Sequence, residues 1–420
     1  MLKTGRLTRP SNGWHKRAMV ERRRPRRAAV PVAAVAMLAA LLACAGSGKR
    51  YACDEDAGPC SHPNTDGGHP DLPPFLGAPV VVAHDGQHDG FGDVIRYAGQ
   101  AYVAYRRATY RGYDGTAQVQ IARSGDRGLT WAPVSTLALP GFDLRDPKLA
   151  VFKDRLVVSF TAWDVKDPTQ NRTFVRFALS DDGAAFATLD PPSLPQPFGL
   201  AAWRPRIVDG ALLLPVWVAD ELLQHPELNH VSLLRSTDGQ SFGVASTLPI
   251  GGGGTEPELL VQAGGKMLVT APERAVLGQP QRQSFCRSTA SAAGLSDWTC
   301  WTANVHVESP ALYDWNGIVL LAGRHDIGDG HKRTGLWQVI EEEKSVQLLA
   351  ELDSAGDTGA LGFVALDDNT ALLSYYSTSR LDPRVASLGH EPTEVESIRN
   401  AFAVDVLALQ LALSSLPISR

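Results

Sequence analysis

Two segments combine charged and aromatic side chains in a way that suits a polar ligand. Trp203-Arg204-Pro205-Arg206 places two cations beside an aromatic ring, a set that can contact the face and the polar edge of a sugar. Glu256 follows four glycines, 251–254, which have no side chains to block close approach to its carboxylate. These residues predict a ligand site, although Trp203 could equally be a core residue and Glu256 a surface charge.

Further charged residues extend this candidate site. Arg145 and Asp146 are adjacent, and they are either an ion pair that orders a loop or a pair that binds a ligand, since exposed pairs are common and weak. Arg274 and Arg324 come just after apolar stretches. That position is compatible with a side chain at the centre of the fold and equally with an exposed turn.

A repeated phrase indicates which elements position these residues. Ser124-Gly-Asp126-Arg-Gly128-Leu-Thr130-Trp131 recurs in shorter form from Ser180 and Ser236, and a degenerate copy begins near Ser288. Successive serines are 56, 56 and 52 residues apart, and such a period is typical of solenoids and propellers. Aspartate and glycine suit a tight turn, and the aromatic residue that follows would pack that turn against a sheet. The phrase is therefore structural, and it predicts the architecture.

The rest of the chain fits short antiparallel strands joined by hairpins. Apolar stretches recur between turn residues, as expected for strands, and no long helical periodicity follows residue 43. Dividing about 340 residues by the period gives six repeats, within the four to eight blades of known propellers. We therefore predict an all-β, six-bladed β-propeller over residues 77–415. The expected strands include Val80–Ala83, Ala101–Tyr105, Leu156–Ala162, Ala211–Val218, Lys266–Ala271, Ile318–Ala322 and Ala371–Tyr376.

Residues 1–44 have the features of a secretory signal. A basic segment, 22–27, precedes an apolar run, 28–43, which is too short to span a bilayer. Leu41-Leu42-Ala43-Cys44 resembles a bacterial lipobox, in which the cysteine is lipidated. Residues 45–76 are rich in proline and glycine and are predicted to be a linker. The chain is therefore expected to be exported and lipid-anchored in the cell envelope, at the outer membrane or its periplasmic face.

Four cysteines remain besides Cys44. In an exported chain an even number predicts disulfides, and proximity favours Cys53–Cys60 and Cys286–Cys300 among the three possible pairings. A metal site is the competing interpretation, but no C-x-x-C or nearby histidine pair supports it. No metal or other cofactor is predicted, and three further histidines also lack ligand spacing: His84, His88 and His325.

The overall charge bears on possible partners. The chain has 40 basic and 45 acidic residues, a formal net charge of −5. Nucleic-acid-binding proteins carry a basic face, so the chain is not expected to bind nucleic acid.

The repeats and their spacing resemble the sialidase superfamily, whose six-bladed propellers carry Asp-box (BNR) repeats and include glycoside hydrolases and lectin-like relatives. Other phrases resemble a bacterial sialidase-like group of largely undefined activity, and the resemblance covers most of residues 80–410. These phrases are Asp143-Leu-Arg145-Asp146-Pro147-Lys148-Leu149, Trp203-Arg204-Pro205-Arg206, Thr255-Glu256-Pro257-Glu258, Ser309-Pro-Ala-Leu312 through Gly323-Arg324, and Gly356-Asp357-Thr358-Gly359.

The resemblance implies a catalytic set of three arginines for the substrate carboxylate, an aspartate acid/base and a tyrosine nucleophile activated by a glutamate. Guanidinium groups bind carboxylates in bidentate fashion, and an oxocarbenium-like transition state needs an acid for the leaving oxygen. Glu256 and Arg274 resemble the family's Glu-then-Arg pair, and Asp114 lies where the acid/base aspartate falls. The further ligand-binding positions implied are Arg145, Asp146, Arg204, Arg206, Arg324 and Asp357.

Two positions depart from the sialidase pattern. No arginine stands near His88-Asp89, where the family has its first arginine. Ala360 occupies the position expected for the nucleophilic tyrosine. Tyr376 could reach inward only if the strand register differed from the expected one.

We therefore predict a cell-envelope lipoprotein whose sialidase-like propeller is an exo-glycosidase acting on an anionic or neutral glycan, with Asp114 and Glu256 as its carboxylates. A catalytically inactive glycan-binding propeller and a scaffold for a partner protein are the alternatives. The expected partners are a carbohydrate ligand and, through the lipid, the membrane, and the protein is expected to be a monomer. The two-carboxylate mechanism requires both side chains to face the axis, about 5–10 Å apart.

Overall fold

The computed structural model divides the chain into a first unit, residues 1–50, and a second unit, residues 51–420. It describes residues 72–166, 172–195, 199–218, 229–250, 254–273, 282–288, 295 and 297–418, all within the second unit. The signal peptide and most of the linker lie outside the described residues. So do four predicted site residues: Cys44, Cys53, Cys60 and Arg274.

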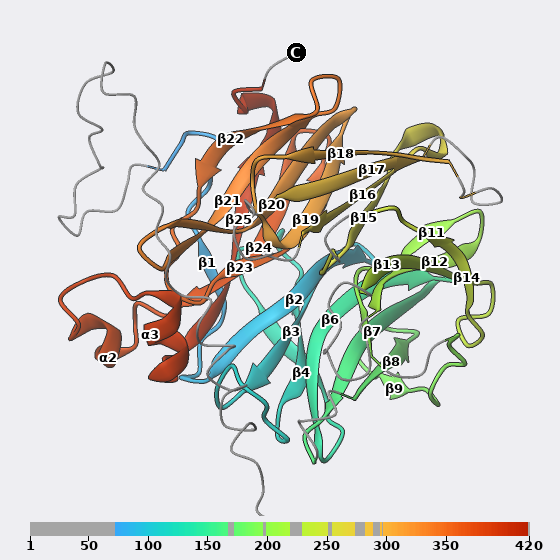
Figure 1. Cartoon of the computed structure of the whole chain (residues 1–420). Helices are drawn as coiled ribbons and strands as arrows, with labels where there is room; N and C mark the ends of the chain where they lie inside the picture. The colour runs from blue at the N-terminus through green and yellow to red at the C-terminus, as the bar shows by residue number, and fades with distance from the viewer. Residues whose placement is uncertain are drawn as a thin grey trace, which may run out of the picture. The chain divides into compact units, whose positions relative to one another are not determined.

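The described residues form an all-β, propeller-like fold (Figure 1). Four of its sheets have the size of a blade, with four or five strands each. Their strands are β6 (Phe142–Phe152), β7 (Arg155–Asp164), β8 (Thr173–Ser180) and β9 (Ala187–Thr188); β10 (Leu200–Ala202), β11 (Arg206–Val208), β12 (Ala211–Val218), β13 (His230–Ser236) and β14 (Gly243–Thr247); β15 (Glu258–Val261), β16 (Met267–Pro272), β17 (Gln283–Ser288) and β18 (Trp298–Ala303); and β19 (Glu308–Trp315), β20 (Ile318–Gly328), β21 (His331–Ile340) and β22 (Ser345–Glu351).

The fifth sheet has eight strands, so six separate sheets, one for each predicted blade, are not found. Its two antiparallel halves meet at a single parallel pair, His88↔Val404. The halves merge because the start of β25 lies beside the start of β2, where the Val404 amide also donates to the Gln87 carbonyl. Its strands are β1 (Val80–Ala83), β2 (His88–Tyr97), β3 (Gln100–Ala108), β4 (Gln118–Ser124), β5 (Ala132–Leu137), β23 (Gly359–Asp367), β24 (Thr370–Thr378) and β25 (Val404–Ala412).

The innermost strands of these sheets form a closed ring. β2 contacts β6, and contacts continue through β11, β15, β19 and β23 back to β2. Six apolar clusters fill the spaces between neighbouring groups of strands around this ring. The hydrophobic core therefore lies between sheets, and the first residues of the inner strands meet at one end of the ring, which we call the mouth.

The three clear copies of the repeated phrase form one kind of turn, between β4 and β5, β8 and β9, and β13 and β14. In the first copy the Gly128 amide donates to Ser124 Oγ at 2.8 Å, and Asp126 accepts from the Thr130 amide at 2.9 Å. Gly128, Gly183 and Gly239 have φ of 88°, 72° and 81°. The predicted turn chemistry of serine, aspartate and glycine is confirmed.

A disulfide joins Cys286 to Cys300, as predicted, where β17 and β18 place the two residues directly opposite. At the N-terminal boundary, Phe75 and Leu76 were assigned to the linker, but both are buried in a core cluster. The folded part therefore begins before residue 77. In the described part of the chain, no helix is long and apolar enough to cross a membrane.

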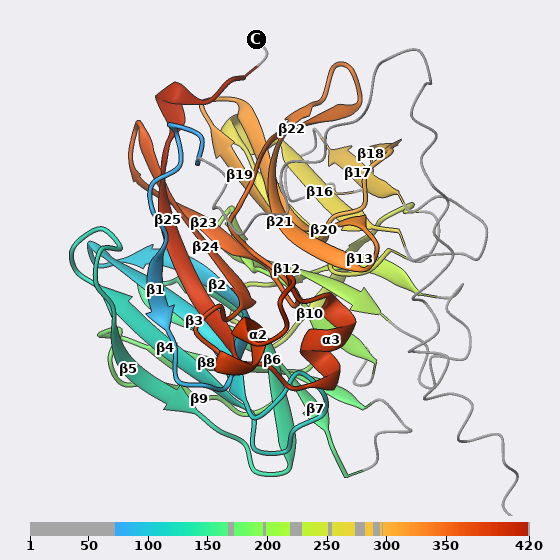
Figure 2. The ribbon, with the colours of Figure 1, turned by 90° about the vertical axis from the view of Figure 1, so that its left-hand side faces the viewer.

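Two short helices, α2 (Pro383–Ala386) and α3 (Glu394–Arg399), lie in the connection from β24 to β25. They pack near the ends of these strands, beside β2 (Figure 2). Ser397 of α3 is hydrogen-bonded to Thr378 at the end of β24, at 3.0 Å. This connection therefore contributes residues to the mouth.

Candidate functional site

The inner strands share an irregularity close to the mouth. In each of four of them the pairing register shifts where extra residues face the neighbouring strand, as in a β-bulge. A bulge bends its strand and turns a side chain away from the usual alternation. The shifts lie between Gly90 and Asp93, Arg145 and Lys148, Glu308 and Ala311, and Ala360 and Gly362.

Backbone strain marks the same positions. Phe91, Asp146 and Ser309 within these bulges have φ of 49° each, and Glu256, just before β15, has φ of 45°. Positive φ is uncommon outside glycine and costs of order 1–3 kcal/mol, and such residues cluster at functional sites. Asp146 and Glu256 are thus two carboxylates held at equivalent, strained positions of the ring.

These two carboxylates also share electrostatic properties. Both are half-buried, and burial raises the pKa of each. The pKa of Glu256 is raised further by the neighbouring Glu308 and, more weakly, by Asp146, whereas Arg324 and the Ser309 amide lower it. Glu256 accepts a hydrogen bond from the Ser309 amide at 2.5 Å. Within the described residues, no hydrogen-bond donor reaches the Asp146 carboxylate.

Arginines flank Asp146. Arg106, fully buried, binds Asp143 through Nε at 2.8 Å and Nη2 at 3.0 Å. Arg145 binds the same carboxylate at 2.8 and 2.9 Å, and its guanidinium lies 5.1 and 5.4 Å from the rings of Tyr113 and Trp163. Arg145 therefore does pair with an aspartate, but its partner is Asp143 and not the adjacent Asp146.

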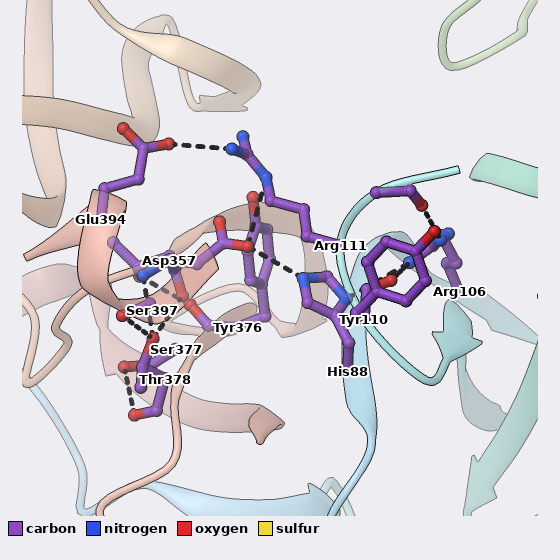
Figure 3. A network of polar contacts seen from close by, with 12 residues as sticks. His88, Arg106, Tyr110, Arg111, Asp357, Tyr376, Ser377, Thr378, Glu394 and Ser397 are labelled. Atoms are coloured by element: carbon purple, nitrogen blue, oxygen red, sulfur yellow. Dashed lines mark hydrogen bonds and ion pairs between the residues drawn. The ribbon is translucent and has the colours of Figure 1, made fainter. Parts of the chain in front are cut away.

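A second group of charges, which we call the mouth cluster, surrounds Asp357 (Figure 3). Asp357 is 2.8 Å from His88 Nε2, 3.2 Å from Arg111 Nε and 3.4 Å from Arg324 Nη1. Burial opposes ionisation of Asp357, yet Arg111, His88 and Arg324 lower its pKa. Burial lowers the pKa of His88 despite its bond to Asp357. The mouth cluster is completed by Glu394 and Glu308.

Both glutamates neutralise Arg324. Glu308 Oε2 lies 2.7 Å from Arg324 Nε, and Glu394 Oε1 lies 2.9 Å from Nη1 of the same side chain. Glu394 also pairs with Arg111, as Figure 3 shows, and the two side chains are 3.2 Å apart. The two arginines therefore share two carboxylates, Asp357 and Glu394.

Tyr376 points into the mouth cluster. It pairs with Gly359, and a Cβ at Gly359 would lie only 2.9 Å from its hydroxyl. Gly90 lies against another part of the Tyr376 aromatic ring: a Cβ at Gly90 would lie 3.1 Å from Cδ2 of Tyr376. The side chain is 0% exposed, its hydroxyl has no hydrogen-bond partner among the described residues, and burial raises its pKa. Tyr376 therefore reaches inward, but it is sealed from solvent.

Asp114, the predicted acid/base, is held by hydrogen bonds within its own loop, and its catalytic role stays a prediction. It accepts four hydrogen bonds, from the amide and hydroxyl groups of Thr109 and Thr116, at 2.6–2.9 Å. Burial opposes ionisation, but these bonds outweigh it and lower the pKa of Asp114 to about 2. Asp114 is thus an ionised group that orders the β3–β4 loop.

Arg204 and Arg206, predicted to bind a ligand, are both paired within the protein. Arg204 is 4% exposed and donates to Asp93 and Glu258 at 2.8 Å each, and to the Leu361 carbonyl. Arg206 Nη2 binds Glu258 at 2.9 Å. Asp93, Arg204 and Glu258 join β2, the β10–β11 connection and β15, and we call this set the central strut. Trp203 is buried, in agreement with the alternative interpretation that it is a core residue.

The structure therefore keeps some predicted residues together and separates others. Asp146, Glu256, Arg324 and Asp357 all face the mouth. The sequence did not point to Arg111, Glu308 or Glu394 as site residues, and it treated His88 as a bystander. One sequence feature could have indicated the strained positions. Each strained residue is followed directly by a glycine or a proline: Gly92, Pro147, Pro257 and Pro310.

The sequence matches no protein-family model and no curated protein. In structure the chain is similar to a protein of unknown function from Dyadobacter fermentans, with a TM-score of 0.62 and 18% identity, over 81% of this chain and 100% of that one. It is also similar to a Trypanosoma rangeli sialidase in complex with 2,3-difluorosialic acid, with a TM-score of 0.55 and 12% identity, over 78% of this chain and 54% of that one.

A third similar structure is the intramolecular trans-sialidase from Ruminococcus gnavus in complex with oseltamivir carboxylate. Its TM-score is 0.55 and its identity 11%, over 79% of this chain and 96% of that one. At these identities the likeness concerns the fold, which is a sialidase-like propeller.

Proposed function

We propose that the protein is a glycoside hydrolase that acts on a glycan bound at the mouth, with Asp146 and Glu256 as its two carboxylates. The observation that carries this proposal is their shared environment: equivalent strained positions, partial exposure and raised pKa values. Glycoside hydrolysis uses such a pair, one carboxyl group protonated and the other ionised.

The surroundings of the two groups assign their roles. Burial and the carboxylate of Glu308 raise the pKa of Glu256, although Arg324 and the Ser309 amide oppose them. We therefore assign Glu256 as the general acid that protonates the leaving oxygen. Asp146 lies near Lys148, Arg145 and Arg106, which favour its ionised form. Asp146 therefore attacks the anomeric carbon or takes a proton from the attacking water.

Hydrolysis of chromogenic glycosides by the full chain tests this function. Glu256→Gln and Asp146→Asn should each lower kcat by about 10²- to 10⁴-fold, the usual contribution of a positioned acid or base, with an unchanged circular dichroism spectrum. Glu342→Gln, an exposed carboxylate in the β21–β22 turn, is the matched control. Full activity in both mouth variants would reject these roles.

Glycan binding without turnover is the second candidate function. It is favoured by the sealed position of Tyr376 and by the internal pairing of Arg111 and Arg324. A glycan array probed with the full chain separates the two functions. If Glu256→Gln still binds glycans and the unmodified chain hydrolyses none, the result would support the glycan-binding function.

We also infer that the eight-stranded sheet represents two blades, which gives six blades in all. Its halves share one residue pair, and the ring of six inner strands with six intervening clusters supports this count. An experimental structure in which β25 and β2 pair over several residues would argue against it.

The proposed location is the cell envelope, with a lipid on Cys44. The support is the sequence Leu41-Leu42-Ala43-Cys44 after a basic and apolar leader. Labelling with radioactive palmitate should modify the chain and should not modify Cys44→Ala, which should also leave the membrane fraction.

A further inference from the structure

Glu394 is held in place by the local structure around it. It is the first residue of α3, whose capping box is formed by Thr393 and Glu396. The Glu394 amide donates to the Gly330 carbonyl at 3.2 Å, across to the β20–β21 hairpin. The cap of the helix thus depends on the neighbours of Glu394, and the Glu394 carboxylate takes no part in it.

That carboxylate lies between two guanidinium groups. Its Oε1 is 2.9 Å from Arg324 Nη1 and 3.2 Å from Arg111 Nη1, and Lys332 Nζ lies 4.0 Å from Oε2. Charge-assisted contacts of this kind are the strong ones. Three cations therefore surround one carboxylate, an arrangement that would suit the carboxylate of a ligand equally well.

Exposure distinguishes Glu394 from the other acidic partner of the two arginines. Asp357 is 1% exposed, and its backbone amide is bonded to Thr378. The side chains of Glu394 and Arg111 are 18% and 25% exposed. Asp357 thus holds the arginines from the inner side, whereas Glu394 occupies their solvent side, where a ligand would arrive.

We propose that Glu394 is an internal competitor that occupies a carboxylate subsite formed by Arg111 and Arg324, and that it thereby sets the preference of the mouth against acidic sugars. This inference rests on the proposed function only in placing the glycan at the mouth. A neutral sugar meets no competitor there, whereas a carboxylate-bearing sugar must displace Glu394 before it reaches the two guanidinium groups.

Calorimetric titration of the full chain tests the proposal with two probes that differ by one charge, N-acetylneuraminic acid and its methyl ester. Glu394→Gln removes the competing charge and keeps the size of the side chain. It should bind the acid at least about tenfold more tightly than the unmodified chain does, since hydrogen bonds between charged groups are the strong ones. Affinity for the methyl ester should not change. Equal affinity of the two proteins for the acid, including no measurable binding by either, would overturn the proposal.

Two further variants exclude a general effect of charge or folding. Glu391→Gln removes a carboxylate of the same segment, but its partner is Arg333, outside the mouth cluster, so affinity for the acid should stay at the level of the unmodified chain. Glu394→Asp keeps the charge on a shorter side chain and should give an intermediate gain. An equal gain in Glu391→Gln would also overturn the proposal.

These outcomes are separate from those of the proposed function. A gain in acid binding by Glu394→Gln would stand even if Glu256→Gln kept full hydrolytic activity. Conversely, Glu256→Gln could lose hydrolysis while Glu394→Gln shows no gain in affinity for the acid. That result would reject the competitor role of Glu394 and keep the proposed hydrolase function.

Discussion

The central strut and the Asp146–Glu256 pair both place charges inside the ring, but they differ in how those charges are satisfied. Arg204 has two carboxylate partners and a carbonyl, and it is 4% exposed. Asp146 and Glu256 are half-buried, and their pKa values are raised. A buried guanidinium bonded to carboxylates of two strands holds those strands together, whereas a partly exposed carboxylate that is costly to ionise is suited to proton transfer.

Breaking the central strut should have the largest effect on stability. Arg204→Met leaves Asp93 buried without its cation and leaves Glu258 with Arg206 alone, and breaking such a buried pair costs about 3–5 kcal/mol. Unfolding in urea measures the loss. Arg206→Met removes a partner of Glu258 whose side chain is 27% exposed, so its loss should be clearly smaller. Equal losses in the free energy of unfolding would show that Arg204 stabilises the fold no more than Arg206 does.

A smaller effect is expected from crowding the strut. Gly362 lies against it, and a Cβ there would be 2.2 Å from Arg204 Nη2 and 2.6 Å from Asp93 Oδ1. Gly362→Ala should therefore lower the free energy of unfolding by about 1–3 kcal/mol, the usual cost of overpacking. Gly243→Ala is the control, because its Cβ would meet nothing within 4 Å. A stable Gly362→Ala protein would contradict the observed packing.

The smallest expected effect is a difference in pH dependence between Asp146 and Asp114. The folded state raises the pKa of Asp146, so ionised Asp146 destabilises the fold above the ordinary aspartate pKa of about 3.9. Asp146→Asn should therefore be at least as stable as the unmodified chain at pH 7, and its advantage should vanish below about pH 4.

Asp114 should behave in the opposite way. Hydrogen bonds lower its pKa to about 2, so its contribution to stability is complete above its unfolded pKa and disappears as the pH falls through about 2. Asp114→Asn should be less stable at pH 7, with a deficit that shrinks towards pH 2. Thermal melting across this pH range measures both variants, and parallel curves would show that the two aspartates do not differ.

The sequence predicted best what is local. The turns after β4, β8 and β13 depend on residues within four positions of one another, such as Ser124 and Gly128, and their spacing revealed the propeller. The Cys286–Cys300 disulfide is similarly local. In each case the interacting atoms come from one hairpin, so the residue pattern alone specifies them.

The site was predicted less well because its interactions are distant in sequence. Arg204 resembled a ligand-binding residue until the structure paired it with Asp93, 111 residues away. Tyr376 reaches inward because it pairs with Gly359 across β23 and β24. This strand register could not be predicted from the sequence. Asp146 and Glu256 were identified, but the bulges that aim them became visible only in the strand pairing.

The closure between β1, β2 and β25 has a consequence for biogenesis. His84 and Asp405, which meet beside it, are 321 residues apart, and His88 and Asp357, which meet in the mouth cluster, are 269 apart. Contacts of such separation form late in folding, because a long loop must close first. A chain that ends before Glu394 therefore lacks part of the mouth cluster, and recognition of a ligand requires nearly the whole sequence to be folded.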